Sequence, residues 1–174
     1  MNKMKEIRIE KVTLNIGAGK ATEVLEKGLK LLKAITNKSP VKTFTNKRIP
    51  AWGLRPGLAI GCKVTIRKEA AIELLKRLLE AKENILSESQ FDKNGNMAFG
   101  LKEYLDIPGM KYDPEIGMLG FEVCVTLERP GFRIKKRKNL KKKIPNKHKI
   151  TKEEAIKFMQ SNFKIKLGEE DDLQ

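Results

Sequence analysis

The sequence predicts a single α+β domain in which helices pack on one face of a largely antiparallel sheet. Apolar and polar residues alternate near residues 12–16, 60–67 and 121–127, which is typical of half-buried strands. Apolar residues recur at helical spacing in segments between and after these strands. The chain has 174 residues, 40% of them hydrophobic, which is enough for the core of one globular domain.

The first half of the chain alternates strands and a helix. Ile7 and Ile9 lie one position out of register with the strand at 12–16, as across a bulge, and Gly17 and Gly19 end that strand. Apolar positions from Val24 to Ile35 then indicate a helix, closed by Asn37 and Pro40. Two strands are expected next, at 41–45 and 60–67, joined by a loop rich in Gly and Pro.

The second half is predicted to hold two further helices. The first covers about 69–86, from the spacing of Ile72, Leu75, Leu78, Leu79 and Leu86. A turn or hairpin with an Asn-Gly centre follows at 91–101, and then the strand at 121–127. Thr151 and Glu154 form a capping-box pattern that opens a helix through about Asn162. The last residues, from Gly168, are expected to be a frayed acidic tail.

These elements suggest a core and an extension within one domain. Residues 1–128 are predicted to form the α+β core, with 45–59 as a projecting loop. Residues 129–174 add a basic extension, the C-terminal helix and the acidic tail, packed on the same domain.

The positive charge is concentrated in two segments. Of a net charge of +15, residues 27–68 contribute eleven cations and residues 129–152 twelve, with no acid in either. Such segregation indicates a polyanionic partner, nucleic acid first and an anionic membrane surface or compacted DNA as alternatives. The basic run has too few large apolar residues on one face for a membrane helix, so no membrane partner is expected.

No pattern in the chain indicates catalysis. Gly17 to Lys20 resembles a phosphate loop, but Leu14 stands where that motif needs glycine and Ala21 where it needs a hydroxyl. His148 is the only histidine and lies among lysines. Cys62 and Cys124 are predicted to be buried free thiols of a reduced, cytosolic protein. We therefore expect no enzyme, metal or cofactor.

Two surfaces are the expected binding sites. Outward residues of a strand repeat every 6.5 to 7 Å or so, close to the phosphate spacing of RNA, so Lys63, Thr65 and Arg67 could follow a backbone. The run in 129–152 repels itself and is expected to become ordered only when phosphates neutralise it. Loops and tails of this kind suit folded RNA better than the regular major groove of DNA.

The loop at 45–59 holds the only tryptophan, Trp52. Cations and no acid surround it, and its glycines and prolines exclude a regular helix. Trp52 is expected either to pack on Pro50 or Pro56 at the base of the loop or to stack on RNA.

Several motifs, in order along nearly the whole chain, resemble one family. They are Asn15-Ile-Gly-Ala-Gly19, Thr36-Asn-Lys-Ser-Pro40, Lys47-Arg-Ile49, Leu54-Arg-Pro-Gly57, Ile60-Gly-Cys-Lys-Val-Thr-Ile-Arg67, Phe91-Asp-Lys-Asn-Gly-Asn-Met-Ala-Phe-Gly100, Tyr112-Asp-Pro-Glu-Ile-Gly117 and Arg129-Pro-Gly-Phe132. The chain is identified from them as similar to the universal large-subunit ribosomal protein five family, in its archaeal form.

The resemblance implies a cytoplasmic, non-enzymatic RNA-binding protein of the central protuberance. Implied partners are 5S rRNA, large-subunit rRNA, the elbow of peptidyl-site tRNA and neighbouring ribosomal proteins. The family's 5S-contacting positions correspond to Asn15, Lys38 and Thr65, with lysine at 38 where glutamine is usual, and its tRNA-facing arm corresponds to 45–59, with Trp52 in place of phenylalanine. With the basic residues added, the expected 5S contacts are Asn15, Lys38, Lys63, Thr65 and Arg67, and the expected tRNA-facing residues are Asn46, Lys47, Arg48, Trp52 and Arg55. Other rRNA contacts are expected from Arg133, Lys135, Lys136, Arg137, Lys138, Lys141, Lys142, Lys143, Lys147, His148 and Lys149.

Overall fold

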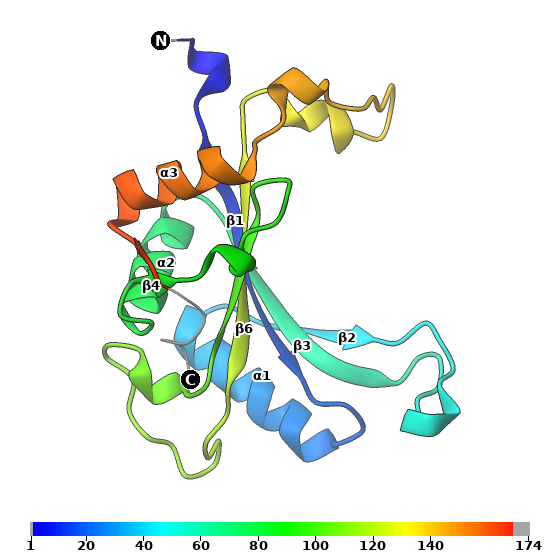
Figure 1. The fold of residues 1–174 in the computed structure, drawn as a ribbon. Coiled ribbons are helices and arrows are strands. Elements are labelled where there is room, and N and C mark those ends of the chain that lie inside the picture. Colours follow the sequence, from blue (N-terminus) through cyan, green and yellow to red (C-terminus); the bar gives the residue numbers. More distant parts are fainter. Residues whose placement is uncertain (1, 169–174) are drawn as a thin grey trace.

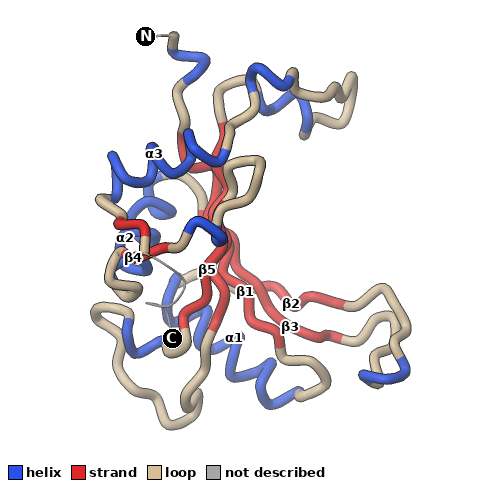
Figure 2. The backbone as a smooth tube through the Cα atoms, in the orientation of Figure 1, coloured by secondary structure: helices blue, strands red, loops and turns tan. Residues whose placement is uncertain are grey.

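The computed structural model describes residues 2–168, and the acidic tail after Gly168 lies outside them. The main sheet has five strands in the order β2-β3-β1-β6-β5, all antiparallel, with helices on one side (Figures 1 and 2). The α+β class is confirmed. The strands are β1 (Arg8–Gly17), β2 (Val41–Phe44), β3 (Ala59–Ile66), β5 (Met97–Leu101) and β6 (Phe121–Glu128). The helices are α1 (Thr22–Thr36), α2 (Glu69–Glu80) and α3 (Lys152–Phe163).

The central strand β1 pairs with β3 on one side and β6 on the other. Its register against β6 shifts between Ile9 and Lys11, so the predicted bulge is confirmed. The bulge returns the apolar residues of both halves of the strand toward the helices. Val12 and Leu14 are fully buried there, and Ile16 is nearly so.

The ends of α1 and α3 follow the local sequence. Asn37 ends α1 in the left-handed conformation, with φ of 53°, and its backbone N–H donates to the carbonyl of Lys33. The Thr151 hydroxyl accepts from the backbone N–H of Glu154, while the Glu154 carboxylate accepts from that of Thr151. This reciprocal pair is the predicted capping box, and it fixes where α3 begins.

The prediction that α2 continues to residue 86 is wrong. The helix ends at Glu80, and Glu83 and Asn84 adopt left-handed conformations, with φ of 56° and 59°, which no α-helix can continue. Leu86 is still fully buried, but it lies in β4 (Ile85–Leu86), which pairs in parallel with β7 (Lys166–Leu167). For Leu86, the apolar spacing therefore predicted burial correctly but not the local backbone.

One continuous hydrophobic cluster joins the sheet to the helices. Leu31 and Leu32 of α1, Leu75 and Leu78 of α2, and Met159 of α3 are buried in it. Ile72, which was counted among the apolar positions of α2, is instead 40% exposed. Because the helices cover one face of the main sheet, the other face is left open along β1, β3 and β6 (Figure 2).

Candidate nucleic-acid interface

The open face of the sheet presents three of the five predicted 5S contacts side by side. Asn15 of β1 lies opposite Lys63 of β3, and Thr13 lies opposite Thr65. The hydroxyl oxygens of Thr13 and Thr65 are 3.5 Å apart. Arg67 is exposed just beyond the end of β3. Strand pairing therefore gathers polar groups from residues about fifty positions apart in the sequence.

An acid that sequence reasoning missed lies on the same face. Glu122 of β6 is opposite Asn15, whose side-chain amide donates to the Glu122 carboxylate at 3.2 Å. The alternation of β6 was the available signal, because Phe121 and Val123 are buried and Glu122 must then point outward. A carboxylate repels phosphate but accepts hydrogen bonds from base amino groups and ribose hydroxyls, so this part of the face suits bases or sugars.

Cys124 is also on the open face, so the prediction that it is buried is wrong. It lies opposite Thr13, on the outward side of β6, and it is half-buried. Partial burial, with a smaller effect of the Glu122 charge, raises the pKa of its thiol. Cys62 is a buried free thiol as expected, and burial raises its pKa too. Neither sulfur is activated as a nucleophile.

Lys38 lies in a turn and is not one of the paired strand residues that form the row of Asn15, Lys63 and Thr65. It follows the left-handed Asn37 in the turn that leads into β2, the edge strand beside β3. Its side chain is exposed, and its backbone N–H donates to the Thr36 hydroxyl at 3.3 Å. Lys38 is therefore outside the paired strands, three residues before Val41 of β2, which lies opposite Lys63.

Residues 45–59, the arm, project from the sheet beyond β2 and β3 (Figure 1). Thr45 is buried at the base of the arm, where its backbone N–H donates to the carbonyl of Leu58 and its own carbonyl accepts from the N–H of Gly57. The Thr45 hydroxyl also accepts from the backbone N–H of Lys47 at 3.2 Å. These bonds give the arm a defined base.

The tip of the arm is a short turn that leaves Trp52 exposed. Pro50–Trp52 form one 3-10 turn, which Gly53 ends at φ of 61°. The Lys20 side chain packs against Gly53, where a Cβ would collide with it. Leu54 is buried in the arm, whereas Trp52 is 66% exposed. Trp52 is therefore available for stacking.

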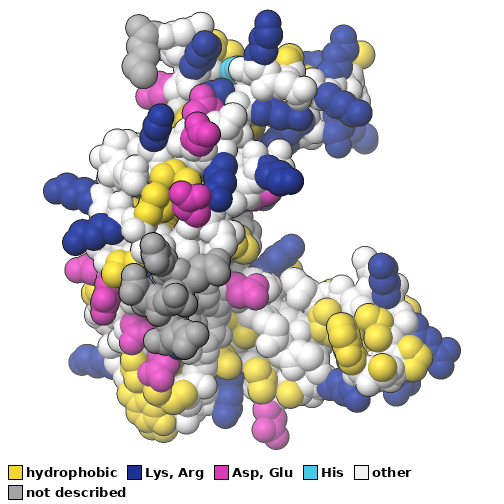
Figure 3. All heavy atoms as spheres, viewed as in Figure 1, with side chains coloured by type: hydrophobic (Ala, Val, Ile, Leu, Met, Phe, Trp, Pro, Cys, Tyr) yellow, Lys and Arg dark blue, Asp and Glu magenta, His cyan; other side chains and the backbone are white. Residues whose placement is uncertain are grey.

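The surface of the arm combines apolar and cationic side chains. Phe44 and Leu58, at its base, are 58% and 37% exposed, and sequence reasoning did not single them out. Asn46, Lys47, Arg48 and Arg55 are all exposed. Figure 3 shows this pattern at the lower right, with hydrophobic atoms bordered by Lys and Arg.

Residues 129–152, the basic extension, form a second projection from the sheet, and their ends are folded. Arg129 is buried and donates to the Glu154 carboxylate at 2.8 Å and to the carbonyl of Lys149 at 3.0 Å. The His148 ring Nε2 lies 2.9 Å from the carbonyl of Pro130, and the ring meets Phe132 edge-on. The expectation of order only with phosphate is therefore wrong for these ends, because protein contacts hold them.

One of the predicted RNA contacts, Lys136, is already engaged by acids. Its ammonium group is 2.6 Å from the Glu10 carboxylate and 3.0 Å from that of Glu128. Burial alone would lower the pKa of Lys136, but the hydrogen bonds to these two carboxylates outweigh it and raise the pKa. Lys136 thus anchors the extension to β1 and β6.

Lys152 is half-buried and lies 3.4 Å from the Glu88 carboxylate, and the remaining cations of the extension are exposed. Lys135 lies over the Phe132 ring at 4.8 Å, and the Arg137 Nε donates to the carbonyl of Leu140 at 2.9 Å. The others make no ion pair with any described residue: Arg133, Lys138, Lys141, Lys142, Lys143, Lys147 and Lys149. Dark-blue side chains mark this projection at the upper right of Figure 3, and the outline is concave between it and the arm.

Residues 2–168 contain no group of three or more His, Cys, Asp or Glu side chains that could hold a metal ion. Among the helices in that range, none is long and apolar enough to cross a membrane.

Comparison with known proteins decides the family. Residues 2–55 match the family model described as ribosomal protein L5, and residues 59–167 match the model described as the C-terminus of the same ribosomal family. The chain belongs to the ribosomal protein L5 family. The break between the two matched regions lies in the arm, yet β1 from the first region pairs with β3 and β6 from the second, so both regions build one sheet.

Archaeal relatives named large ribosomal subunit protein uL5 are similar over nearly the whole chain. The relative from Methanobrevibacter smithii is 46% identical over 165 residues, covering 95% of this chain and 97% of the relative. That from Sulfolobus acidocaldarius is 46% identical over 168 residues, covering 97% and 94%. That from Nanoarchaeum equitans is 48% identical over 165 residues, covering 94% and 97%.

Membership in the ribosomal protein L5 family confirms the coarser predictions. The protein is a structural, non-enzymatic constituent of the large subunit of the cytoplasmic ribosome, with rRNA and ribosomal proteins as partners.

Proposed function

We propose that this member of the ribosomal protein L5 family binds 5S rRNA with the open face of its sheet. The observation that carries the proposal is the row formed by Asn15, Lys63 and Thr65, which lie side by side on a face that the helices leave uncovered. Lys63 supplies charge for phosphates, while Asn15 with Glu122 supplies donors and acceptors for bases or ribose hydroxyls. The half-buried threonines supply short hydroxyl contacts that need little side-chain ordering.

The two projections extend this binding surface. The free cations of the basic extension bind rRNA phosphates beside the sheet, in 5S rRNA or in the adjoining large-subunit rRNA. The arm presents Lys47, Arg48 and Arg55 around an exposed Trp52, a combination that fits backbone contact plus stacking on a nucleotide. We assign the arm to the elbow of peptidyl-site tRNA.

Replacement of the two uncharged residues of the row tests the role of the sheet. Asn15→Ala plus Thr65→Ala should weaken binding to 5S rRNA about tenfold to a hundredfold, because each lost polar contact costs about 1 kcal/mol or more. The melting temperature should change little, since neither side chain is in the hydrophobic core. Gel shift and melting curves on the full chain measure the two quantities.

A matched control uses two polar residues on the helix side. Gln160→Ala plus Ser161→Ala removes exposed groups of α3 and should leave 5S affinity unchanged. Parallel titrations with duplex DNA of equal length and with anionic vesicles test selectivity. Unchanged 5S affinity in the double variant of the row, or equal affinity for all three ligands, would contradict the proposal.

A further inference from the structure

A groove on the helix side of the molecule is separate from the RNA-facing surfaces. It has a volume of about 1100 Å³ and lies between the N-terminal segment 2–9, α2 and α3. These elements lie on the left and top of the view in Figure 1, away from the arm. The groove is lined by the apolar side chains Ile7, Ile9, Ile72, Phe158 and Phe163.

The apolar lining includes a side chain that the fold itself does not bury. Ile72 is 40% exposed although Leu75 and Leu79, on the same helix, are buried. Phe158 and Phe163 of α3 are only half-buried. Burying such side chains on association is favourable by about 25 cal/mol for each Å² removed from water.

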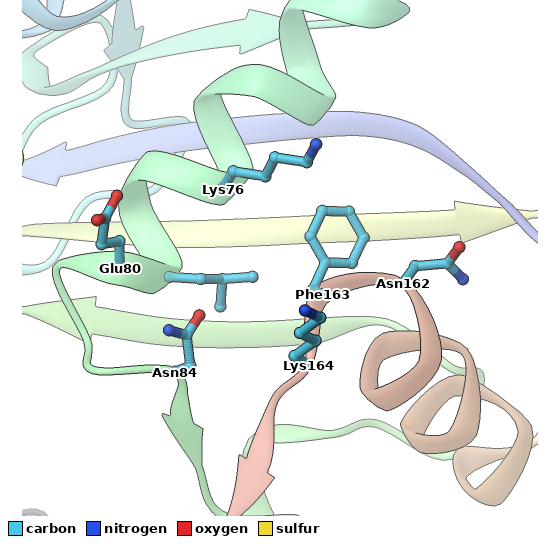
Figure 4. A pocket seen from close by; sticks show the side chains of 7 residues that line it. Lys76, Glu80, Asn84, Asn162, Phe163 and Lys164 are labelled. Atoms are coloured by element: carbon cyan, nitrogen blue, oxygen red, sulfur yellow. The ribbon is translucent and has the colours of Figure 1, made fainter.

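The groove continues past Phe163 toward the end of α2. A smaller hollow of about 350 Å³ shares Lys76, Asn162 and Phe163 with it. Figure 4 shows the Lys76 side chain from α2 and the Phe163 ring from α3 extending toward each other in that hollow. The two hollows adjoin, and the larger one alone has about the volume of the largest pockets that hold small molecules.

The charges around the groove are predominantly positive once internal pairs are set aside. Arg8 is paired with Glu128, and Arg129 with Glu154. The other charged side chains on the rim are Lys3, Lys5, Lys76 and Lys157, opposed only by Glu6. None of these four lysines makes an ion pair within residues 2–168.

We propose that this groove binds an acidic amphipathic helix of a neighbouring ribosomal protein. Apolar residues of such a helix would contact Ile72 and Phe158, and its acidic residues would meet the lysines of the rim, as in other helix-in-groove complexes. RNA fits less well, because phosphates gain nothing from an isoleucine and phenylalanine lining. The inference is independent of the 5S assignment, since none of the residues assigned to 5S rRNA or to tRNA line the groove.

The test uses the full chain and three synthetic peptides of about 18 residues each. The first has Leu on one helical face and Glu elsewhere, the second replaces Glu by Lys, and the third keeps the composition of the first but scatters the Leu residues. Fluorescence anisotropy should show binding of the first peptide with a Kd below about 100 µM. The other two should bind at least about tenfold more weakly.

Variants locate the binding. Lys76→Glu plus Lys157→Glu should weaken binding of the acidic peptide at least about tenfold, and Ile72→Ser about threefold or more. The matched control, Lys102→Glu plus Lys111→Glu, makes the same change of charge at two exposed lysines outside the groove and should stay within about twofold. Melting curves confirm that every variant is folded.

Four results would overturn the inference, three from the peptide experiments and one from a shortened chain. The first is equal binding of the Glu and Lys peptides, and the second is an equal loss in the control and groove variants. The third is displacement of the peptide by 5S rRNA, which would assign the groove to RNA. A chain ending at Gly168 should bind the peptide with unchanged affinity; a tenfold gain would instead assign the groove to the chain's own acidic residues.

Discussion

Replacement of Arg129 by methionine tests what holds the basic extension to the core. The Arg129 side chain is 6% exposed and joins the end of β6 to the segment before α3 and to α3 itself. Its guanidinium donates to Glu154 at 2.8 Å and to the carbonyl of Lys149 at 3.0 Å, with a longer contact to that of His148 at 3.4 Å. Methionine keeps much of the apolar stem and removes these donors.

The expected loss of stability is about 2 kcal/mol. A hydrogen bond from a charged donor contributes about 1.5–3 kcal/mol, and the Lys149 carbonyl loses such a donor. Glu154 is 43% exposed, so water can replace its partner, and that loss adds no more than about 1 kcal/mol. The buried guanidinium also has an Nε without a hydrogen-bond partner among the described residues. Methionine removes the cost of keeping that group away from water, and this offsets part of the lost stability.

Urea and thermal unfolding of the full chain measure the effect. For a chain of this length, 2 kcal/mol corresponds to a fall in Tm of about 4–8 °C. Arg137→Met is the matched control, because Arg137 is exposed in the same extension and its side chain donates to the carbonyl of Leu140 alone among the described residues. The control should change the free energy of unfolding by less than about 0.5 kcal/mol.

Equal stability of Arg129→Met and wild type would refute the reasoning. It would mean that desolvation of the buried guanidinium cancels its hydrogen bonds, as happens for some buried ion pairs. Glu154→Gln separates the cases, because glutamine preserves the capping box while the Arg129 charge stays buried with a weaker partner. A loss in Glu154→Gln without one in Arg129→Met would confirm that cancellation.

The ion pairs, the arm and the basic extension each lead to one further prediction. Burial alone would raise the pKa values of Glu128 and Glu154, but hydrogen bonds from Lys136 and Arg8 to Glu128, and from Thr151 and Arg129 to Glu154, lower both. The two ionised carboxylates therefore stabilise the fold above the ordinary Glu pKa of about 4.3, and this stabilisation is lost as pH falls through the lowered pKa values. The difference in Tm between wild type and Glu154→Gln should accordingly shrink below pH ~4. Replacing residues 46–57 by an Asn-Gly turn should leave the affinity for 5S rRNA within about threefold of wild type. The same change should weaken contacts with peptidyl-site tRNA, which footprinting measures. Loss of 5S binding would contradict a separate role for the arm. If about eight phosphates are contacted, a plot of the logarithm of the binding constant against the logarithm of salt concentration should have a slope near −6 to −7. Lys142→Gln should make this slope shallower by about 1, whereas Lys136→Gln should not, because Lys136 is already paired with acids. Equal changes in slope would show that Lys136 also contacts phosphate.

The strands and the helix caps could be predicted because their signals are local. The alternation at 60–67 specifies which side chains of β3 are buried, and the Thr151–Glu154 pair specifies where α3 begins. The end of α2 could not be read in the same way. Leu86 continues the helical spacing, but the left-handed Glu83 and Asn84 direct it into β4, whose partner β7 is about eighty residues away.

The outward positions of single strands could be predicted, but not the surface that these positions form together. The outward positions of β3 follow from alternation, whereas the neighbours of Asn15 depend on strand order. Glu122 became part of the face only because β6, and not another strand, pairs with β1. The exposure of Ile72 likewise depends on how α3 and the N-terminal segment pack around α2.

Charge segregation along the chain differs from charge segregation in space. Both basic segments lack acids in sequence, yet Lys30 pairs with Glu115, and Lys136 with Glu10 and Glu128. These acids come from other segments of the chain, so folding pairs some cations of both basic segments with acids. Within residues 2–168, the cations of the arm and of the outer part of the extension stay outside such pairs. Because an unpaired charge in water contributes almost nothing to folding, their concentration on two projections beside an open sheet is explained by a polyanionic ligand and not by stability.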